Sequence, residues 1–233
     1  MTSPTAHAPA PSSLPPVAWL LECAHVPDDT KALVSDVSDG AALVESLTTN
    51  NKRAEALRVI AAALPPREAV WWAWVSVRHA AQAAAPGGTI PPNVAGVLAE
   101  IERWISTPDE TNRLAVWAAG ERAGLDTPAG CAAAAVFFTS GSVAPPDVSP
   151  PVPPPAGIDR LLVGNAVSLA AATNPVHFEA LAGAYIAQGL EVVKQLGGWD
   201  KAVAVSREFY DAQHDRHTRA LTPPASTVPR QST

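Results

Sequence analysis

The chain of 233 residues has little charge and very little sulfur, with 16% charged residues, two cysteines and one methionine. Cys23 and Cys131 stand far apart, one in an apolar segment and one in an alanine-rich run, so two buried free thiols are favoured over a disulfide. Acidic residues outnumber the scattered basic ones, 22 to 16. Because nucleic-acid binding needs a dense positive face, this balance argues against a nucleic-acid partner.

Long hydrophobic runs are also missing. No apolar stretch of membrane-spanning length is free of proline or glycine, which argues against a membrane span. The short apolar stretch 17–24 follows a proline-rich segment with no basic residue, so no secretory signal is expected. Both observations, with the unpaired cysteines, predict a cytoplasmic protein.

Recognisable catalytic motifs are absent too, including the G-x-S-x-G, P-loop and G-x-G-x-x-G patterns. The best metal-like spacing lies near the C-terminus, where Arg216 and Arg219 intervene. Histidines and arginines at a helix end are what the helix dipole favours, so a solvated helix end is the better interpretation. The sequence therefore predicts no metal and no cofactor, and it favours a protein that is not an enzyme. The residues of that spacing are Asp211, His214, Asp215 and His217.

Apolar residues, at 47% of the chain, are numerous enough for a substantial core, and their spacing is helical. The segment 92–106 is the clearest case, with its large apolar residues on one arc. Thr107-Pro108 and Thr127-Pro128 each combine an N-cap residue with a proline in the first turn, and both are predicted to start helices. Since no segment alternates at period two, we predict an all-α fold of about eight to ten helices, with stacked helical hairpins as one arrangement.

Proline marks the organisation of the chain. Residues 1–16 and 221–233 are rich in proline, alanine and serine and are predicted to be disordered tails. A helical region over 17–138 and C-terminal helices over 158–220 are expected to form one domain. Between them, 139–157 contains seven prolines and can be neither helix nor inner strand. An ordered crossover packed on an aromatic residue is favoured there, with a docking motif as the alternative.

Three of the seven tryptophans lie within four positions of one predicted helix, 64–82. At 100° per residue Trp74 falls on the apolar arc, so it is predicted to lie in the core. The opposite arc is polar but also carries Trp71 and Trp72, so this helix needs packing partners on two sides. The second face could serve a partner protein or be covered by another layer of the same domain. Its candidate partner-binding residues are Arg67, Glu68, Trp71, Trp72 and Arg78.

The run Ala63-Leu-Pro-Pro-Arg-Glu-Ala-Val-Trp-Trp72, the segment 127–143 and the following proline-rich stretch resemble an uncharacterised bacterial family of all-helical proteins. The hallmark of that family is a Leu-Pro-x-Arg-Glu-Ala-Val-Trp-Trp segment. The resemblance implies a domain of unknown function with no established active site. It also implies a genomic setting near type VI secretion genes for some members.

These observations favour a non-enzymatic helical scaffold or adaptor that binds another protein, as an accessory of a bacterial type VI secretion system. The alternative is an enzyme of unidentified chemistry with a pocket near Arg67, Glu68 and His79.

Overall fold

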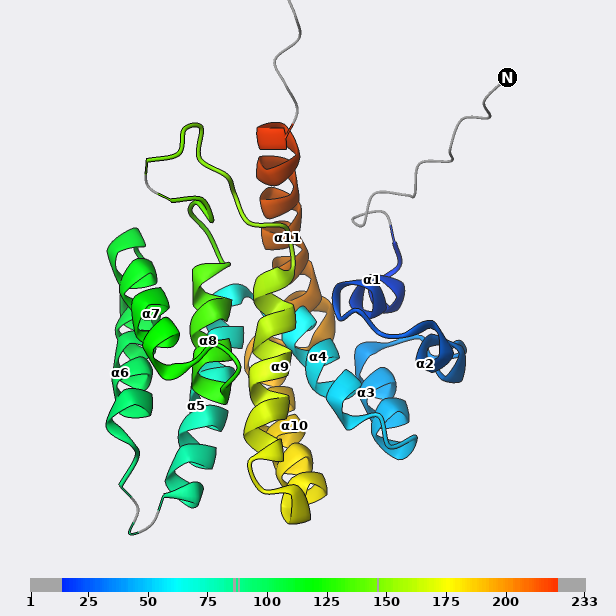
Figure 1. The fold of residues 1–233 in the computed structure, drawn as a ribbon. Coiled ribbons are helices and arrows are strands. Elements are labelled where there is room, and N and C mark those ends of the chain that lie inside the picture. Colours follow the sequence, from blue (N-terminus) through cyan, green and yellow to red (C-terminus); the bar gives the residue numbers. More distant parts are fainter. Residues whose placement is uncertain (1–13, 86, 88, 146, 222–233) are drawn as a thin grey trace, which may run out of the picture.

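A computed structural model describes residues 14–85, 87, 89–145 and 147–221. Over these ranges the chain forms eleven α-helices and no strand, which confirms the predicted all-α fold (Figure 1). Apart from residues 14–16 and 221, the two predicted tails lie outside the described ranges. None of the described helices is long and apolar enough to cross a bilayer.

Three short helices pack at one side of the molecule: α1 (Pro16–Cys23), α2 (Asp28–Leu33) and α3 (Gly40–Thr49). The carboxylate of Asp39 accepts a hydrogen bond from the Ala42 amide (2.9 Å) and so caps the start of α3. Both α1 and α3 lie against α4 (Arg53–Ala63), which links this side to the rest of the fold.

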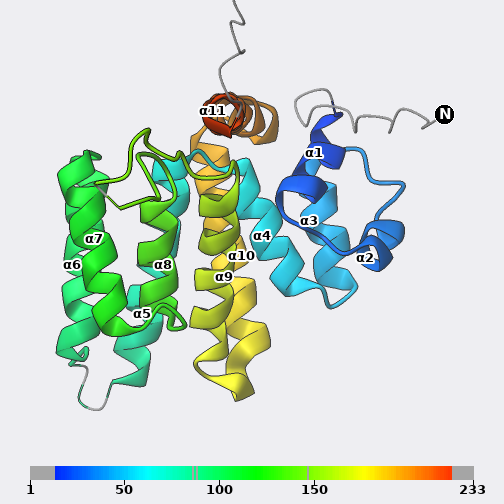
Figure 2. The ribbon, with the colours of Figure 1, turned by 45° about the horizontal axis from the view of Figure 1, so that its top comes forward.

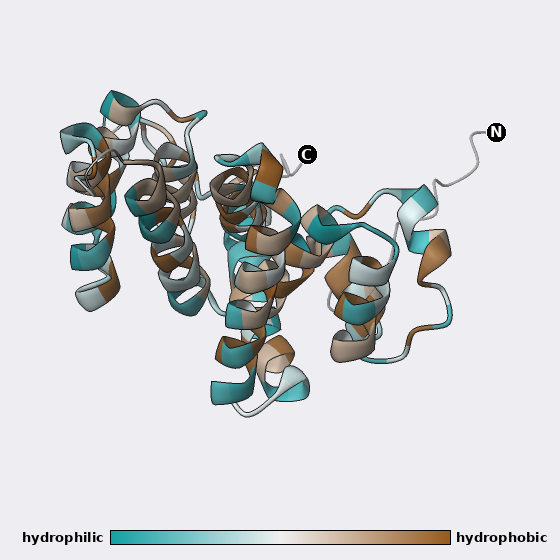
Figure 3. Cartoon of the chain, turned by 90° about the horizontal axis from the view of Figure 1, so that it is seen from below, coloured by the Kyte–Doolittle hydropathy of each residue, from teal (hydrophilic) through white to brown (hydrophobic). Residues whose placement is uncertain are grey.

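Six longer helices form the body in two layers, with α7, α8 and α9 in one and α6, α5 and α10 in the other (Figure 2). Helix α5 touches α6, α8, α9 and α10, so the tryptophan helix is central. Figure 3 shows hydrophobic residues beside hydrophilic ones along each helix, the pattern of helices that bury one face. The bounds are α5 (Pro66–Ala84), α6 (Pro92–Ser106), α7 (Glu110–Ala123), α8 (Pro128–Phe137), α9 (Ile158–Ala172) and α10 (Phe178–Gln195), with a 3-10 turn η3 (Pro175–His177) before α10.

The proline-rich segment does not separate two domains, because α9 packs against α8, α4 and α5. Glycine permits the closest approach on this side. A Cβ at Gly164 would stand 2.7 Å from the Arg58 side chain and 2.9 Å from its Cα, so α9 and α4 could not pack this closely with a larger residue there.

The tryptophans of α5 are placed differently from the prediction. Trp72 is fully buried (0% exposed), and its Nε1 donates a hydrogen bond to the Tyr185 carbonyl in α10 (3.1 Å). Trp74 is only half-buried, at the seam with α6, where its Nε1 donates to the Leu98 carbonyl (2.9 Å). The placement of Trp74 in the core was therefore wrong. Of the two alternatives left open for the face that bears Trp72, coverage by another layer of the same domain is the one found at this residue. Helix α10, which lies far away in the sequence, covers the side of α5 that bears Trp72.

The two predicted Thr-Pro helix starts have different outcomes. At Thr127 the hydroxyl accepts a hydrogen bond from the Gly130 amide (3.0 Å), which confirms the cap of α8. At Thr107 the prediction was wrong, because α7 begins at Glu110 and is capped by Asp109, whose carboxylate accepts from the Asn112 amide (2.8 Å). Thr107 instead closes α6, and its amide donates to the Arg103 carbonyl.

Both cysteines are free and buried, and burial raises the pKa of the Cys23 thiol to about 12 and that of Cys131 to about 11. Since the thiolate is the nucleophile, on the order of one Cys131 thiol in a thousand would be reactive at pH 8. We therefore expect an aromatic disulfide reagent at pH 8 to leave the folded protein unmodified for minutes, and to titrate both thiols after unfolding in guanidinium. Rapid stoichiometric reaction of the native protein would contradict this burial.

Candidate functional site

A cavity of about 650 Å³ opens where the first residues of α5 face the last helix, α11 (Trp199–Leu221). We call it the α5–α11 groove. One wall comes from the body of the fold and includes Pro65, Pro66, Arg67, Glu68 and Trp104. The other wall comes from α11 and is formed by Val205, Glu208, Phe209, Ala212 and Arg216.

The body wall is shaped by two adjacent prolines. Pro65 and Pro66 end α4 and start α5, with Pro66 in the first turn, where its missing N–H costs nothing. The next residue, Arg67, donates from Nε to the Ile105 carbonyl (2.7 Å), a group near the end of α6 that lacks an intrahelical donor. Glu68 is half-buried, and its carboxylate makes no hydrogen bond or ion pair within the part of the chain that the structure describes.

A buried polar network holds α11 in place. Arg160, at the start of α9, donates from Nε to the Ser206 hydroxyl (3.0 Å) and from Nη2 to the Ser206 carbonyl (3.0 Å). The Ser206 hydroxyl in turn donates to the Ala62 carbonyl of α4 (2.7 Å). Since the residue four positions after Ala62 is a proline, that carbonyl has no donor within the helix, and α11 supplies one. The same two prolines therefore shape the body wall and create an acceptor that anchors α11.

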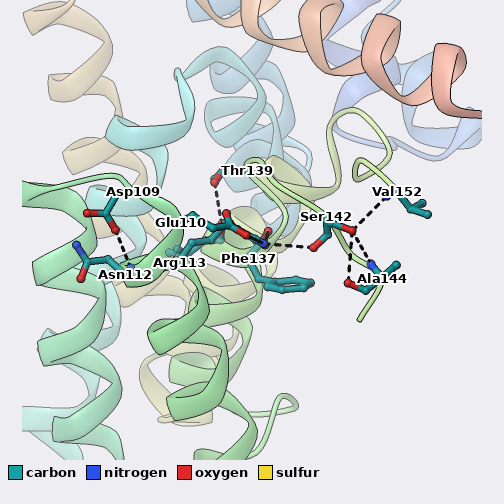
Figure 4. A network of polar contacts seen from close by, with 10 residues as sticks. Asp109, Glu110, Asn112, Arg113, Phe137, Thr139, Ser142, Ala144 and Val152 are labelled. Carbon is teal, nitrogen blue, oxygen red and sulfur yellow. Dashed lines mark hydrogen bonds and ion pairs between the residues drawn. The ribbon is translucent and has the colours of Figure 1, made fainter. Parts of the chain in front are cut away.

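A second network fixes the turn that closes the groove beyond α8 (Figure 4). Arg113 is 1% exposed and pairs through two nitrogens with the Glu110 carboxylate (2.7 and 2.6 Å), which lowers the pKa of Glu110. Its Nη1 donates to the Phe137 carbonyl (2.6 Å), and its guanidinium lies over the Phe137 ring. Its Nη2 also donates to the Ser142 carbonyl (3.2 Å), so the first residues after α8 are tied to α7.

The described part of the crossover 139–157 is ordered by its own hydrogen bonds. The Ser142 hydroxyl accepts from the amides of Ala144 (3.2 Å) and Val152 (3.1 Å). His217 of α11 donates from Nδ1 to the Pro153 carbonyl (2.7 Å), and Gly157 packs against the ring of Tyr210. The described part of the crossover thus packs within the molecule, against α11.

The structure separates the five predicted partner-binding residues. Arg67 and Glu68 line the α5–α11 groove, and Trp71, 39% exposed, lies one turn further along α5. Arg78 is exposed but lies over the Trp74 ring at 5.1 Å, a contact within the fold. Trp72 is inaccessible, so its choice as a binding residue was wrong.

The enzyme alternative required Arg67, Glu68 and His79 around one pocket, and this arrangement was wrong as well. His79 does not line the groove, and its Nδ1 lies 2.9 Å from the Tyr185 hydroxyl of α10. The separation follows from helix geometry, because eleven residues of α5 span roughly 16 Å. The groove itself is lined mainly by apolar atoms, and exposed charges of both signs border it.

The model of a family of unknown function, DUF6931, matches residues 43–193, more than half of the chain. The chain belongs to this family. The match confirms the resemblance to an uncharacterised domain, and comparisons with curated proteins and with solved structures found no match. The DUF6931 match includes the body wall of the groove but ends before α11 begins. Sequence reasoning missed the α11 wall, because it selected candidates only from the second face of the tryptophan helix.

Proposed function

We propose that this DUF6931 protein is a non-enzymatic helical adaptor that binds another protein through the α5–α11 groove. The observation that carries the proposal is Phe209, which is 50% exposed and lines an apolar groove. Protein interfaces concentrate their binding energy in a few aromatic and arginine side chains surrounded by more weakly contributing contacts. Phe209 supplies the exposed aromatic surface here, Trp104 lies buried in the wall beside it, and Arg67 and Arg216 border the groove.

The proposal also covers the identity of the partner and the cellular compartment. The resemblance noted from the Leu-Pro-Pro-Arg-Glu-Ala-Val-Trp-Trp segment makes components of a type VI secretion system the first partners to examine. Two buried, unpaired thiols fit a reducing compartment, so we expect the encounter to take place in the cytoplasm.

The test compares two substitutions of exposed apolar residues by aspartate, in the full chain expressed in its own host. Phe209→Asp places a charge in the groove, whereas the control Leu114→Asp places one on α7, where Leu114 is 42% exposed and outside the groove. A hot-spot residue contributes about 2 kcal/mol or more, so Phe209→Asp should weaken partner binding roughly 30-fold or more. Quantitative co-purification and thermal unfolding of each variant provide the measurement.

Both variants should unfold within a few degrees of the wild type, because neither side chain is buried. Equal recovery of the stoichiometric partner with Phe209→Asp and Leu114→Asp would remove the groove from the interface. Absence of any stoichiometric partner of the wild-type chain would remove the adaptor function itself.

A further inference from the structure

Helix α11 has two apolar faces, but the fold uses only one of them. Ser206 and Gln213 lie on the buried face, toward α4 and α9. The second face lines the groove and is turned from the buried one by roughly a quarter of a revolution, at 100° per residue. A helix that only completes the core needs a single buried face, so the second one is available to something outside this fold.

The spacing of the second face matches a helical partner. Val205, Phe209, Ala212 and Arg216 follow one another at intervals of four, three and four residues, the a/d spacing of helices that pack side by side. This strip is about 16 Å long at 1.5 Å per residue, which matches some eleven residues, or three turns, of a second helix. The side chains of an extended peptide alternate every two residues and would not match this spacing.

Charges beside the strip indicate which helix would fit. Glu208 and Asp215 each precede a residue of the strip, stand seven positions apart and lie exposed along its outer edge. Glu68 lines the body wall of the same groove as Glu208, next to Arg67. None of these three carboxylates makes a hydrogen bond or ion pair through its side chain within the described ranges. Charges at flanking positions of this kind select the partner, and acidic ones select basic residues.

We propose that the occupant of the α5–α11 groove is an amphipathic helix of a partner protein, packed lengthwise on α11, with lysine or arginine residues facing Glu208 and Asp215. This inference rests on the proposed adaptor function and specifies the class of binding segment.

Two other occupants fit these charges poorly. A second copy of α11 packed antiparallel would bring Glu208 opposite Asp215 of the copy, two like charges. The chain's own end segments also lack the required chemistry. Residues 1–13 contain no lysine or arginine, and residues 222–233 contain only Arg230 and three prolines that oppose a helix.

The experiment places the photoreactive amino acid p-benzoylphenylalanine at position 209 of the full chain, expressed in its own host. The crosslinked peptide is identified by mass spectrometry. We expect a segment of another protein that has apolar residues at intervals of three and four, no internal proline, and lysine or arginine beside them. In the double variant Glu208→Lys, Asp215→Lys the crosslink yield should fall at least tenfold.

Reversing the facing basic residues of the partner to glutamate should restore the crosslink to the double variant. The control Glu102→Lys, Glu121→Lys changes two exposed acids of α6 and α7 outside the groove and should leave the yield unchanged. A crosslink between two copies, to residues 1–13 or 222–233, or to a proline-rich or acidic segment would overturn the inference. A crosslink to any other protein would still support the adaptor function, whereas no crosslinked protein at all would overturn both.

Discussion

Replacing Trp72 with alanine is expected to lower the free energy of unfolding by about 3 to 5 kcal/mol, the range for deleting a buried large aromatic side chain. The indole is fully buried and its hydrogen bond to the Tyr185 carbonyl joins α5 to α10. Gly189 lets α10 approach it so closely that an added Cβ would stand 3.0 Å from the ring. Because domains of this kind are stable by about 5 to 15 kcal/mol, the loss could take most of the available stability.

Urea unfolding of three single variants measures this effect along one helix. Trp71→Ala, at a position 39% exposed, should cost the least, and Trp74→Ala should fall between Trp71→Ala and Trp72→Ala, since Trp74 is half-buried. A loss for Trp71→Ala equal to that for Trp72→Ala would show that the packing of α5 differs from the one described here.

This order also shows where sequence analysis stops. The bounds of α6, Pro92–Ser106, coincide with the segment predicted from periodicity, and the cap at Thr127 was predicted from a local pattern. Such features depend on residues within a few positions of each other. Which face of α5 is covered depends on α10, more than a hundred residues later, and helical periodicity contains no information about that contact.

The burial of charged residues could not be predicted from the sequence for the same reason. Arg113 and Arg160 are each 1% exposed, although a charged residue in a helical pattern is normally interpreted as solvent-facing. Each guanidinium has a carboxylate partner close in the sequence, but it also donates to oxygens of elements far away in the sequence, Phe137 for Arg113 and Ser206 for Arg160. Pro65-Pro66 gave one local signal, because two residues without N–H must leave acceptors open in the preceding helix. That signal predicts a donor near Ala62, but it cannot name Ser206.

Sequence analysis predicted the α5 side of the candidate site but not the α11 side, for a related reason. Arg67 and Glu68 were selected because they lie on the polar arc of the tryptophan helix, and both line the groove. Phe209 was not selected, because α11 carries two apolar faces and the sequence does not show which one the fold covers. Only the position of the Arg160 network, which turns Ser206 and Gln213 inward, assigns the second face to the groove.

Replacing Arg160 with methionine is expected to cost about 3 to 5 kcal/mol at pH 8, the range for removing one partner of a buried ion pair. Burial raises the pKa of the Asp159 carboxyl, and the neighbouring Arg160 guanidinium opposes that rise. Without Arg160 the carboxyl is left buried and unpaired, and Gln213 and the Ser206 carbonyl lose a donor. The exposed control Arg103→Met, which loses only an ion pair to Glu100, should change stability by about 1 kcal/mol or less.

The pH dependence of the Arg160→Met variant provides the sharper test. An acid whose pKa is raised in the folded state binds its proton more tightly when the protein is folded. The protein therefore loses stability as the pH rises from the pKa of the unfolded state through that of the folded state. Removing the guanidinium raises the pKa of Asp159 further, so the penalty should be smaller at pH 4.5 than at pH 8. Adding Asp159→Asn should recover part of it at pH 8, and hydrogen exchange should show α11 losing protection before α5. A penalty that is independent of pH, with no recovery in the double variant, would show that Asp159 and Arg160 do not act as a coupled buried pair that anchors α11.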